Sequence, residues 1–160
     1  MVVRLGVMLH RRRRTPGSHG LAVDLDALWD FGDPAASERR LASALAGAVG
    51  TDAAVLRTQV ARALGLQRRF AEASAILSTV NAGDSALVAT HLDLERGRIL
   101  NSGGAPAASR PHFLGALQCA EAAGLEFLAA DAAHMLAIIE PGDAAVPWVE
   151  RALAIARSGR

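Results

Sequence analysis

The chain has 160 residues, of which 51% are hydrophobic, and this length suits a single domain with a sizeable apolar core. The 17 basic residues are all arginine and nearly balance the 16 acidic ones, so the net charge of +1 excludes a strongly basic nucleic-acid-binding surface over the whole chain. The single cysteine, Cys119, excludes an internal disulfide and is typical of a cytoplasmic protein.

The first twenty residues, MVVRLGVMLHRRRRTPGSHG, predict a basic, disordered tail. Its arginines follow the apolar stretch, whereas a secretory signal has its charges first, and the stretch is too short to cross a bilayer. The run from Arg11 to Arg14 suits contact with nucleic acid or anionic lipid, but we favour a solvated segment. Removing the five arginines of the tail leaves 12 against 16 acidic residues, a charge of about −4, so we expect no nucleic-acid surface on the folded body.

Residues 21–158 predict a helical domain built from pairs of helices. Apolar residues recur at helical spacing, as in Leu56, Val60 and Leu64. Breaks within the pairs fall at GDP (32–34), LQRR (66–69), GGAP (103–106) and PGD (141–143). Turn and cap residues between successive pairs are GTD (50–52), NAGDS (81–85) and Gly124. The turn chemistry therefore divides the domain into short helices joined by tight connections.

These helix pairs repeat every 36 residues. At this offset and without gaps, segments 57–80, 93–116 and 129–152 match in character. One column of the alignment holds Leu28, Leu64, Leu100 and Leu136, and a column of small residues holds Ala61, Gly97 and Ala133. A single pair cannot bury its apolar face, so the pairs must stack, and we expect an all-α fold of about four antiparallel helix pairs. The small residue at position 97 should let two helices approach closely.

The pattern within each repeat resembles the tetratricopeptide repeat (TPR). A small residue is followed three positions later by a large apolar one, then by a turn and an apolar–Ala–apolar motif, which FAEASAIL (70–77) matches best. The segments LWDFGDPAASE (28–38), LERGRILNSGG (94–104) and DAAHMLAI (131–138) are similar to parts of longer bacterial proteins of this family. The resemblance covers residues 21–158 and implies a TPR-like, right-handed α-solenoid whose first helices line a concave groove. It also implies a non-enzymatic scaffold or adaptor that binds proteins or peptides and needs no cofactor.

Two polar columns run through the same alignment. Gln59, Glu95 and Asp131 form the first, and Arg62, Arg98 and His134 form the second. Within each helix the two members are three residues apart, which puts them on one helix face, and stacking should then bring acceptors and donors of neighbouring repeats together. The resemblance puts these columns near the groove, and Asn101, Trp29 and Asp30 in the same region.

These polar residues have three interpretations. They could only fix the stacking of the helices, since single pairs at this spacing contribute a few tenths of a kcal/mol. They could instead present arginine donors to a carboxylate or another anionic group of a bound peptide or protein. The alternative is a small anionic metabolite, sensed or transformed, with His134 as acid–base, Asp131 orienting it and Arg98 as anion clamp. For these columns we favour the first interpretation and put peptide or protein binding second, and no nucleophile, phosphate loop or metal cluster in the sequence supports catalysis. For the chain as a whole, the leading functional hypothesis is still the peptide- or protein-binding module. A closed pocket around Arg98 and His134 would favour the metabolite.

The remaining features predict no metal and one further interface. The residues His91, His112, Cys119 and His134 lack the spacing of a zinc site. Trp148 is expected to pack between helices. In the last helix, Leu153 and Ile155 are expected to be left uncovered, so that the chain forms a homodimer or meets another partner there.

Overall fold

The computed structural model describes residues 21–158, and in that range it is all helical. The described residues form eight α-helices and one short 3-10 helix, without a β-strand. The expected all-α class is therefore confirmed. The basic tail predicted for residues 1–20 lies outside the described residues. Among the described helices, none has the length and apolarity that a bilayer crossing requires.

Short connections join the helices in chain order. The elements are α2 (Leu25–Leu28), α3 (Pro34–Ala46), α4 (Gly50–Leu66), α5 (Phe70–Ser78), α6 (Ala86–Ser102), α7 (Pro106–Ala122), α8 (Glu126–Ile139), the 3-10 helix η1 (Gly142–Ala145) and α9 (Val146–Ser158). Most of the expected breaks fall at the boundary between two of these elements, but GTD (50–52) forms the first turn of α4, and Gly142 and Asp143 of the PGD break belong to η1. Asp33 caps α3 by accepting a hydrogen bond from the backbone N–H of Ala36 at 2.9 Å, and Ser85 caps α6 in the same way. Gly124 adopts φ +67° between α7 and α8.

The first pair differs from the others because α2 is a single turn. Asp24 caps this turn, but the chain is already extended at Trp29. The repeat alignment predicts a helical segment that reaches the GDP break, and the structure shows only its beginning. Asp33 precedes Pro34, and a residue before proline disfavours the helical region. Residues 29–33 therefore form a turn that folds back along α3 and α4.

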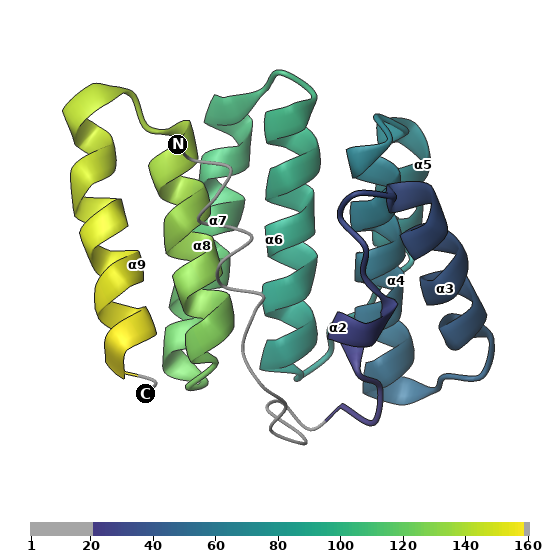
Figure 1. Cartoon of the computed structure of the whole chain (residues 1–160). Helices are drawn as coiled ribbons and strands as arrows, with labels where there is room; N and C mark the ends of the chain where they lie inside the picture. Colours follow the sequence, from purple (N-terminus) through teal and green to yellow (C-terminus); the bar gives the residue numbers. More distant parts are fainter. Residues whose placement is uncertain (1–20, 159–160) are drawn as a thin grey trace.

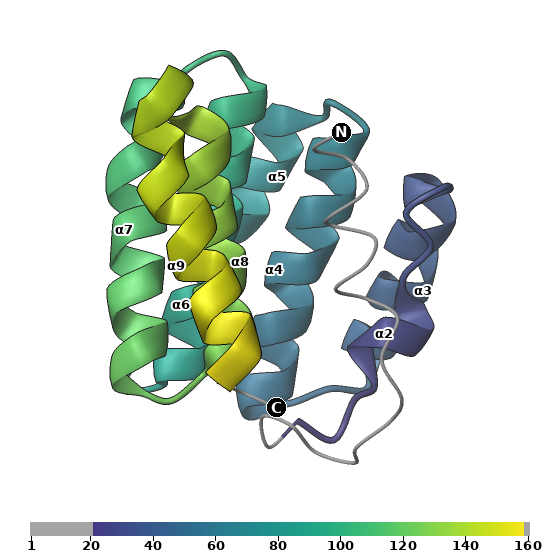
Figure 2. The same ribbon diagram turned by 60° about the vertical axis from the view of Figure 1, so that its left-hand side comes forward.

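Neighbouring helices pack side by side around one continuous core. Each helix from α3 to α9 contacts the next one along the chain, and α6 also packs against α4 and α8. The helices α4, α6 and α8 consequently lie next to one another, with α2 at one end (Figure 1). The largest fully buried side chains include Leu56, Leu94 and Phe113. α9 closes the other end of the row and packs against α8 (Figures 1 and 2).

The expected close approach at Gly97 is confirmed. A Cβ atom on Gly97 would lie 2.4 to 2.8 Å from three ring atoms of Phe113, which is impossible without a shift. Gly97 is on α6 and Phe113 is on α7, so the glycine lets the aromatic ring rest on the α6 backbone. Ala61 and Ala133, which are 36 residues before and after Gly97 in the sequence, are fully buried. The cost of glycine in a helix, about 1 kcal/mol relative to alanine, is thus offset by helix packing.

Candidate functional site

The two polar columns form a ladder across three helices. Each helix carries one residue of each column: α4 has Gln59 and Arg62, α6 has Glu95 and Arg98, and α8 has Asp131 and His134. Because these helices lie side by side, the columns come together in space. We call these six residues the polar ladder, and the side of α4, α6 and α8 that carries them the ladder face.

Arg98 is the central link of the polar ladder. One terminal nitrogen of its guanidinium donates to Oε1 of Glu95 on the same helix, and the other donates to Oδ2 of Asp131 on α8 at 2.5 Å. On the other side, Nη1 of Arg62 lies 3.9 Å from the same Glu95 oxygen. Acids and bases of successive helices therefore alternate, as the spacing predicts. Arg98 ties α6 to α8, whereas Arg62 connects α4 to α6 through a longer contact.

Charge and burial shift the pKa values of the polar ladder in opposite directions. Burial lowers the pKa of Arg98, but the nearby carboxylates of Asp131 and Glu95 outweigh burial and the net pKa is raised. Burial raises the pKa of Asp131, but Arg98 and Arg62 outweigh it and the net pKa is lowered. Burial and repulsion from Arg98 lower the pKa of Arg62, because the two acids offset them only in part. Arg62 is therefore the cation whose charge the ladder neutralises least.

Glu95 brings an unsatisfied oxygen into this network. Its side chain is 1% exposed, and within residues 21–158 no group donates a hydrogen bond to Oε2. A buried acceptor without a donor costs about 1–3 kcal/mol, and more for a charged group. The Coulomb attraction of two guanidinium groups at Oε1 compensates for this cost. Oε2 remains an acceptor for any donor that reaches it.

Gln59 is fixed by a relay of hydrogen bonds. The indole N–H of Trp29 donates to Oε1 of Gln59 at 3.1 Å, which fixes the orientation of the amide. The amide nitrogen of Gln59 then lies 3.2 Å from Nδ1 of His91, so this ring nitrogen is the acceptor. Gln59 is 3% exposed. It therefore serves to hold Trp29 against α4 rather than to meet a ligand.

Trp29 and Phe31 form an aromatic pair over Arg62. Their rings are stacked, with centroids 4.8 Å apart and planes 3° apart. The guanidinium carbon of Arg62 lies 5.4 Å from the Trp29 centroid and 5.3 Å from the Phe31 centroid, within the range of a cation–π interaction. Phe31 and His91 are members of this site that the sequence did not indicate. Phe31 lies in the turn between α2 and α3, and its proximity to α4 depends on how that turn folds back.

Three predicted residues, of which His134 is itself part of the polar ladder, make no hydrogen bond to another ladder residue. Asp30 is exposed and accepts from the backbone N–H of Gly32 at 3.0 Å, so it stabilises the turn before α3. Asn101 has no side-chain hydrogen bond to any described residue. His134 is half-buried, and within residues 21–158 no hydrogen bond joins it to Asp131, whose oxygen is engaged by Arg98. The acid–base pair that a catalytic role for His134 requires is therefore not formed.

Exposed apolar side chains flank the polar ladder on its own face. Leu66 follows Arg62 by four residues and is 51% exposed. On α8, Phe127 precedes Asp131 by four residues, Ile138 follows His134 by four, and both are 42% exposed. Residues four apart share a helix face, so these side chains border the ladder. The ladder face thus combines a charge-paired centre with apolar margins.

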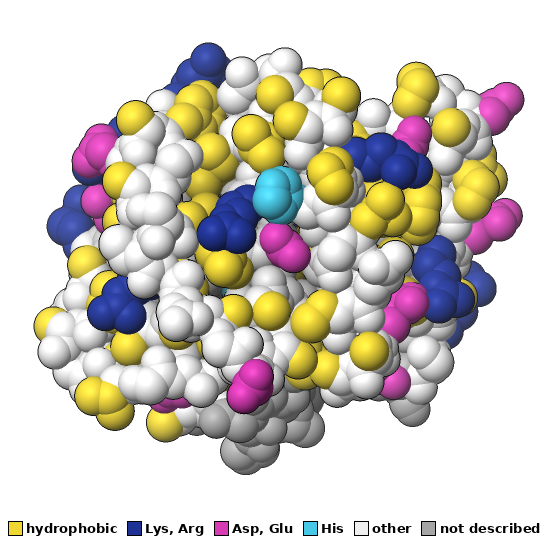
Figure 3. Space-filling model, turned by 180° about the vertical axis from the view of Figure 1, so that it is seen from behind, with side chains coloured by type: hydrophobic (Ala, Val, Ile, Leu, Met, Phe, Trp, Pro, Cys, Tyr) yellow, Lys and Arg dark blue, Asp and Glu magenta, His cyan; other side chains and the backbone are white. Residues whose placement is uncertain are grey.

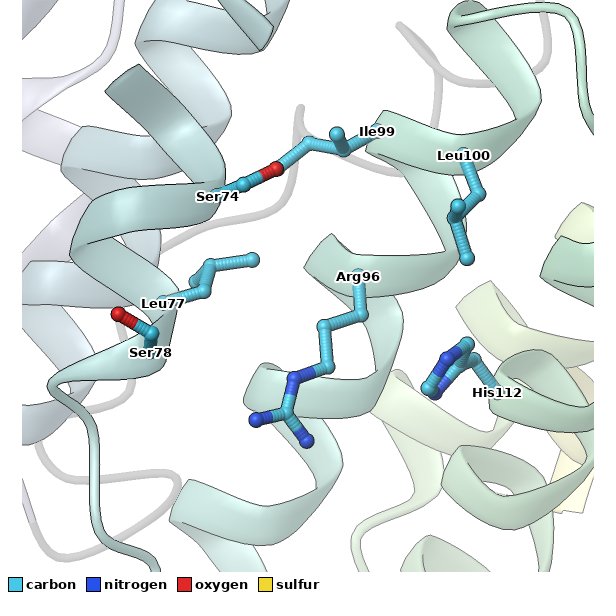
Figure 4. A pocket seen from close by; sticks show the side chains of 7 residues that line it. All are labelled: Ser74, Leu77, Ser78, Arg96, Ile99, Leu100 and His112. Atoms are coloured by element: carbon cyan, nitrogen blue, oxygen red, sulfur yellow. The ribbon is translucent and has the colours of Figure 1, made fainter. Parts of the chain in front are cut away.

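A pocket of about 210 Å³ lies elsewhere, between α5, α6 and α7 (Figure 4). Its lining comprises Ser74, Leu77, Ser78, Arg96, Ile99, Leu100 and His112. None of these belongs to the predicted site. On the face opposite to the view of Figure 1, charged side chains are scattered among hydrophobic ones and form no patch of one sign (Figure 3).

The described residues hold no group of three or more His, Cys, Asp or Glu side chains that could bind a metal ion. No protein-family model, curated protein or solved structure matches the chain. Function is therefore inferred from the geometry of the site alone.

Proposed function

We propose that this chain is a TPR-like interaction module, a right-handed α-solenoid whose ladder face binds a peptide or protein segment without catalysis. Two observations support the repeat architecture. Successive members of each polar column are 36 residues apart in the sequence and lie on adjoining helices. The columns are Gln59–Glu95–Asp131 and Arg62–Arg98–His134. The column of small residues is also buried: Ala61 and Ala133 lie in the core, and Gly97 lies where α6 touches Phe113 of α7.

The proposed binding role rests on the position of the exposed large apolar side chains. Eight such side chains occur among the described residues, and four of them, Phe31, Leu66, Phe127 and Ile138, surround the polar ladder. Clusters of exposed apolar side chains bordered by polar groups mark surfaces that bind partners. A peptide laid across α4, α6 and α8 would cover these four side chains.

Arg62 is the polar anchor of the proposed site. Its side chain is 21% exposed, and its contact with Glu95 is long at 3.9 Å, so its other donors remain available to a partner. Phe31 lies over the guanidinium and Leu66 one turn further along α4. A carboxylate flanked by apolar side chains matches this arrangement, because guanidinium–carboxylate pairs are strong and directional. The proposed partner is therefore an acidic–apolar peptide segment.

A site for a small anionic metabolite at Arg98, Asp131 and His134 has less support. Both terminal nitrogens of Arg98 are already engaged by carboxylates, so it has little capacity left for an anion. The pocket between α5, α6 and α7 does not include these residues. Peptide binding at Arg62 requires neither a free Arg98 nor a paired His134.

Selection from a random peptide library displayed on phage tests the proposal. We expect enriched peptides to carry an acidic residue beside apolar ones, and to shift amide NMR signals on α4, α6 and α8. Replacing Arg62 by alanine should weaken such a peptide about tenfold or more, the usual effect of removing a charged hydrogen-bond donor. The matched variant Arg57→Ala, on another side of α4, should bind normally. Equal binding by the two variants, or shifts confined to other helices, would refute the proposal.

A second copy of the chain is proposed as the partner of α9. This helix has no buried residue, and Val149 and Leu153 are exposed on its outer side. Glu150 and Arg157 share that side two turns apart, and neither forms an ion pair with a described residue. In an antiparallel pair of α9 helices centred near Leu153, Glu150 of each copy meets Arg157 of the other. The outer side of α9 is thus complementary to the same side of a second copy, as a two-fold interface requires.

A further inference from the structure

The pocket between α5, α6 and α7 arises from a difference in helix length. α5 has 9 residues, whereas α6 and α7 have 17 each, so α5 leaves part of α6 without a neighbour. Figure 4 shows Ser74, Leu77 and Ser78 on one side of the opening, α6 in the middle and His112 on the far side. This volume of about 210 Å³ suits a small molecule rather than a peptide.

Most of the pocket surface is apolar. Leu77 and Ile99 are buried, and Leu100 is half-buried beside them. The two serines lie on the exposed side of α5, and the hydroxyl of Ser78 already donates to the Ala75 carbonyl of its own helix at 2.7 Å. An apolar group of a ligand would therefore be stabilised by contact with the three aliphatic side chains.

Arg96 places a cation at this apolar surface. Its side chain extends into the opening between α5 and His112 (Figure 4). It forms no ion pair with any described residue, unlike Arg98 two positions later. The Arg96 guanidinium therefore retains its donors for a ligand, and a carboxylate is the group that matches its geometry.

His112 is held in a fixed orientation at the edge of the pocket. Its Nδ1 lies 2.9 Å from Oδ1 of Asp93, which leaves Nε2 as the ring nitrogen available to the pocket. A Cβ atom on Gly115, one turn further along α7, would come within 3.1 Å of the other Asp93 oxygen. The glycine thus makes room for the carboxylate that orients His112.

We propose that this pocket binds a small organic carboxylate with a compact apolar body. The carboxylate pairs with Arg96, the apolar body rests on Leu77, Ile99 and Leu100, and the ring of His112 forms one wall of the pocket. The proposal is independent of peptide binding, because the ladder face involves other side chains of α6. Each function can therefore fail without the other.

Titration of the isotope-labelled chain with hexanoate, followed by amide NMR, tests the proposal. Signals of residues 74–78, 96–100 and 112 should shift and saturate at millimolar hexanoate. Hexanol has the same chain without the charge and should bind at least about tenfold more weakly. Hexanoate that shifts no signals in these segments, or no more strongly than hexanol does, would overturn the proposal.

Two substitutions locate the binding. Arg96→Met keeps the apolar stem and should weaken hexanoate about tenfold or more, while Arg57→Met, the same change on α4, should leave it unaltered. Ser74→Trp adds bulk at an exposed position of the rim and should block binding without unfolding the chain. If hexanoate binds the Arg96 and Ser74 variants as it binds the wild-type chain, the pocket is not its site.

Discussion

Phe113 occupies the space that a side chain on residue 97 would need. The two positions are 16 residues apart, and the positions 36 residues earlier in the sequence hold Ala61 and Leu77. The larger alanine at position 61 is thus matched by the smaller leucine at position 77, and the smaller glycine at position 97 by the larger phenylalanine at position 113. The sum of the two side-chain volumes, rather than either residue alone, suits the distance between the helices.

Replacing Gly97 by alanine should therefore lower the free energy of unfolding, by about 1–3 kcal/mol, the usual cost of overpacking a core. Adding Phe113→Leu should recover part of that loss, because the pair then matches Ala61 and Leu77. Urea denaturation measures both effects. Gly47→Ala is the control, since a Cβ there meets no atom within 4 Å and φ is negative. Equal stability of the Gly97 and Gly47 variants would contradict this account.

Asp131 makes the polar ladder sensitive to acid. Its pKa is lowered in the folded chain by Arg98 and Arg62, in spite of burial. A carboxyl whose folded pKa is depressed stabilises the fold above its unfolded pKa of about 3.9, and this contribution is lost as the pH falls through the folded value. The polar ladder should therefore weaken only in acid, below the ordinary range of aspartate.

Asp131→Asn should cost about 2 kcal/mol of unfolding free energy at pH 7, because it leaves Arg98 short of one charged partner. The difference from the wild-type chain should begin to shrink below about pH 4, where the unfolded chain binds the proton first, and should vanish once the pH is below the depressed pKa of the folded carboxyl. Urea denaturation at a series of pH values measures this difference. Asp84→Asn, in the exposed turn before α6, should show no such trend. A loss that is the same at all pH values would mean that charge is not the cause.

At the scale of the helices, α9 packs against α8 but has no buried residue. Trp148 and Ile155 pack against the core, as expected for Trp148, whereas Ile155 was expected to be uncovered. Leu153 is exposed, as expected. The exposed apolar side chains of α9 beside the charges of Glu150 and Arg157 are therefore Val149 and Leu153, rather than Leu153 and Ile155 as the sequence suggested.

If two copies pair through α9, light scattering should give a dimer, and Glu150→Arg should shift it to the monomer. Arg157→Glu should act in the same way, because each change brings like charges together across the two-fold axis. The double variant Glu150→Arg/Arg157→Glu should form the dimer again. A wild-type chain that stays monomeric at the highest concentration measured would contradict the pairing.

Helix boundaries were predictable where turn residues mark them. Asp33 with Pro34, Ser85 and Gly124 each end or begin an element where the sequence indicates. The short α2 was not predictable from the repeat, because the extended backbone at Trp29 is stabilised by contacts with Gln59 and Arg62, 30 and more residues away. A long-range contact of this kind leaves no periodic signal.

At the scale of the whole molecule, the repeat predicted which side chains meet. Residues 36 apart in the sequence lie on adjoining helices, so Glu95, Arg98 and Asp131 could be grouped without coordinates. Phe31 and His91 could not be predicted as members of the site in this way, because neither belongs to a polar column. The pocket at Arg96 could not be predicted either, since it depends on the short α5 leaving α6 uncovered.

The amino-acid sequence alone determined the helical class, the breaks between helices and the membership of the polar ladder, because these follow from local turn chemistry and from a fixed spacing along the chain. The tertiary structure decided which ion pairs and hydrogen bonds the residues of the polar ladder form. Both terminal nitrogens of Arg98 are engaged by carboxylates, whereas Arg62 keeps donors for a partner. The turn at residues 29–33 brings the aromatic pair of Trp29 and Phe31 over Arg62. The reason is that distances between side chains on different helices depend on how closely each pair packs, and side-chain volume and helix length set that packing only in three dimensions.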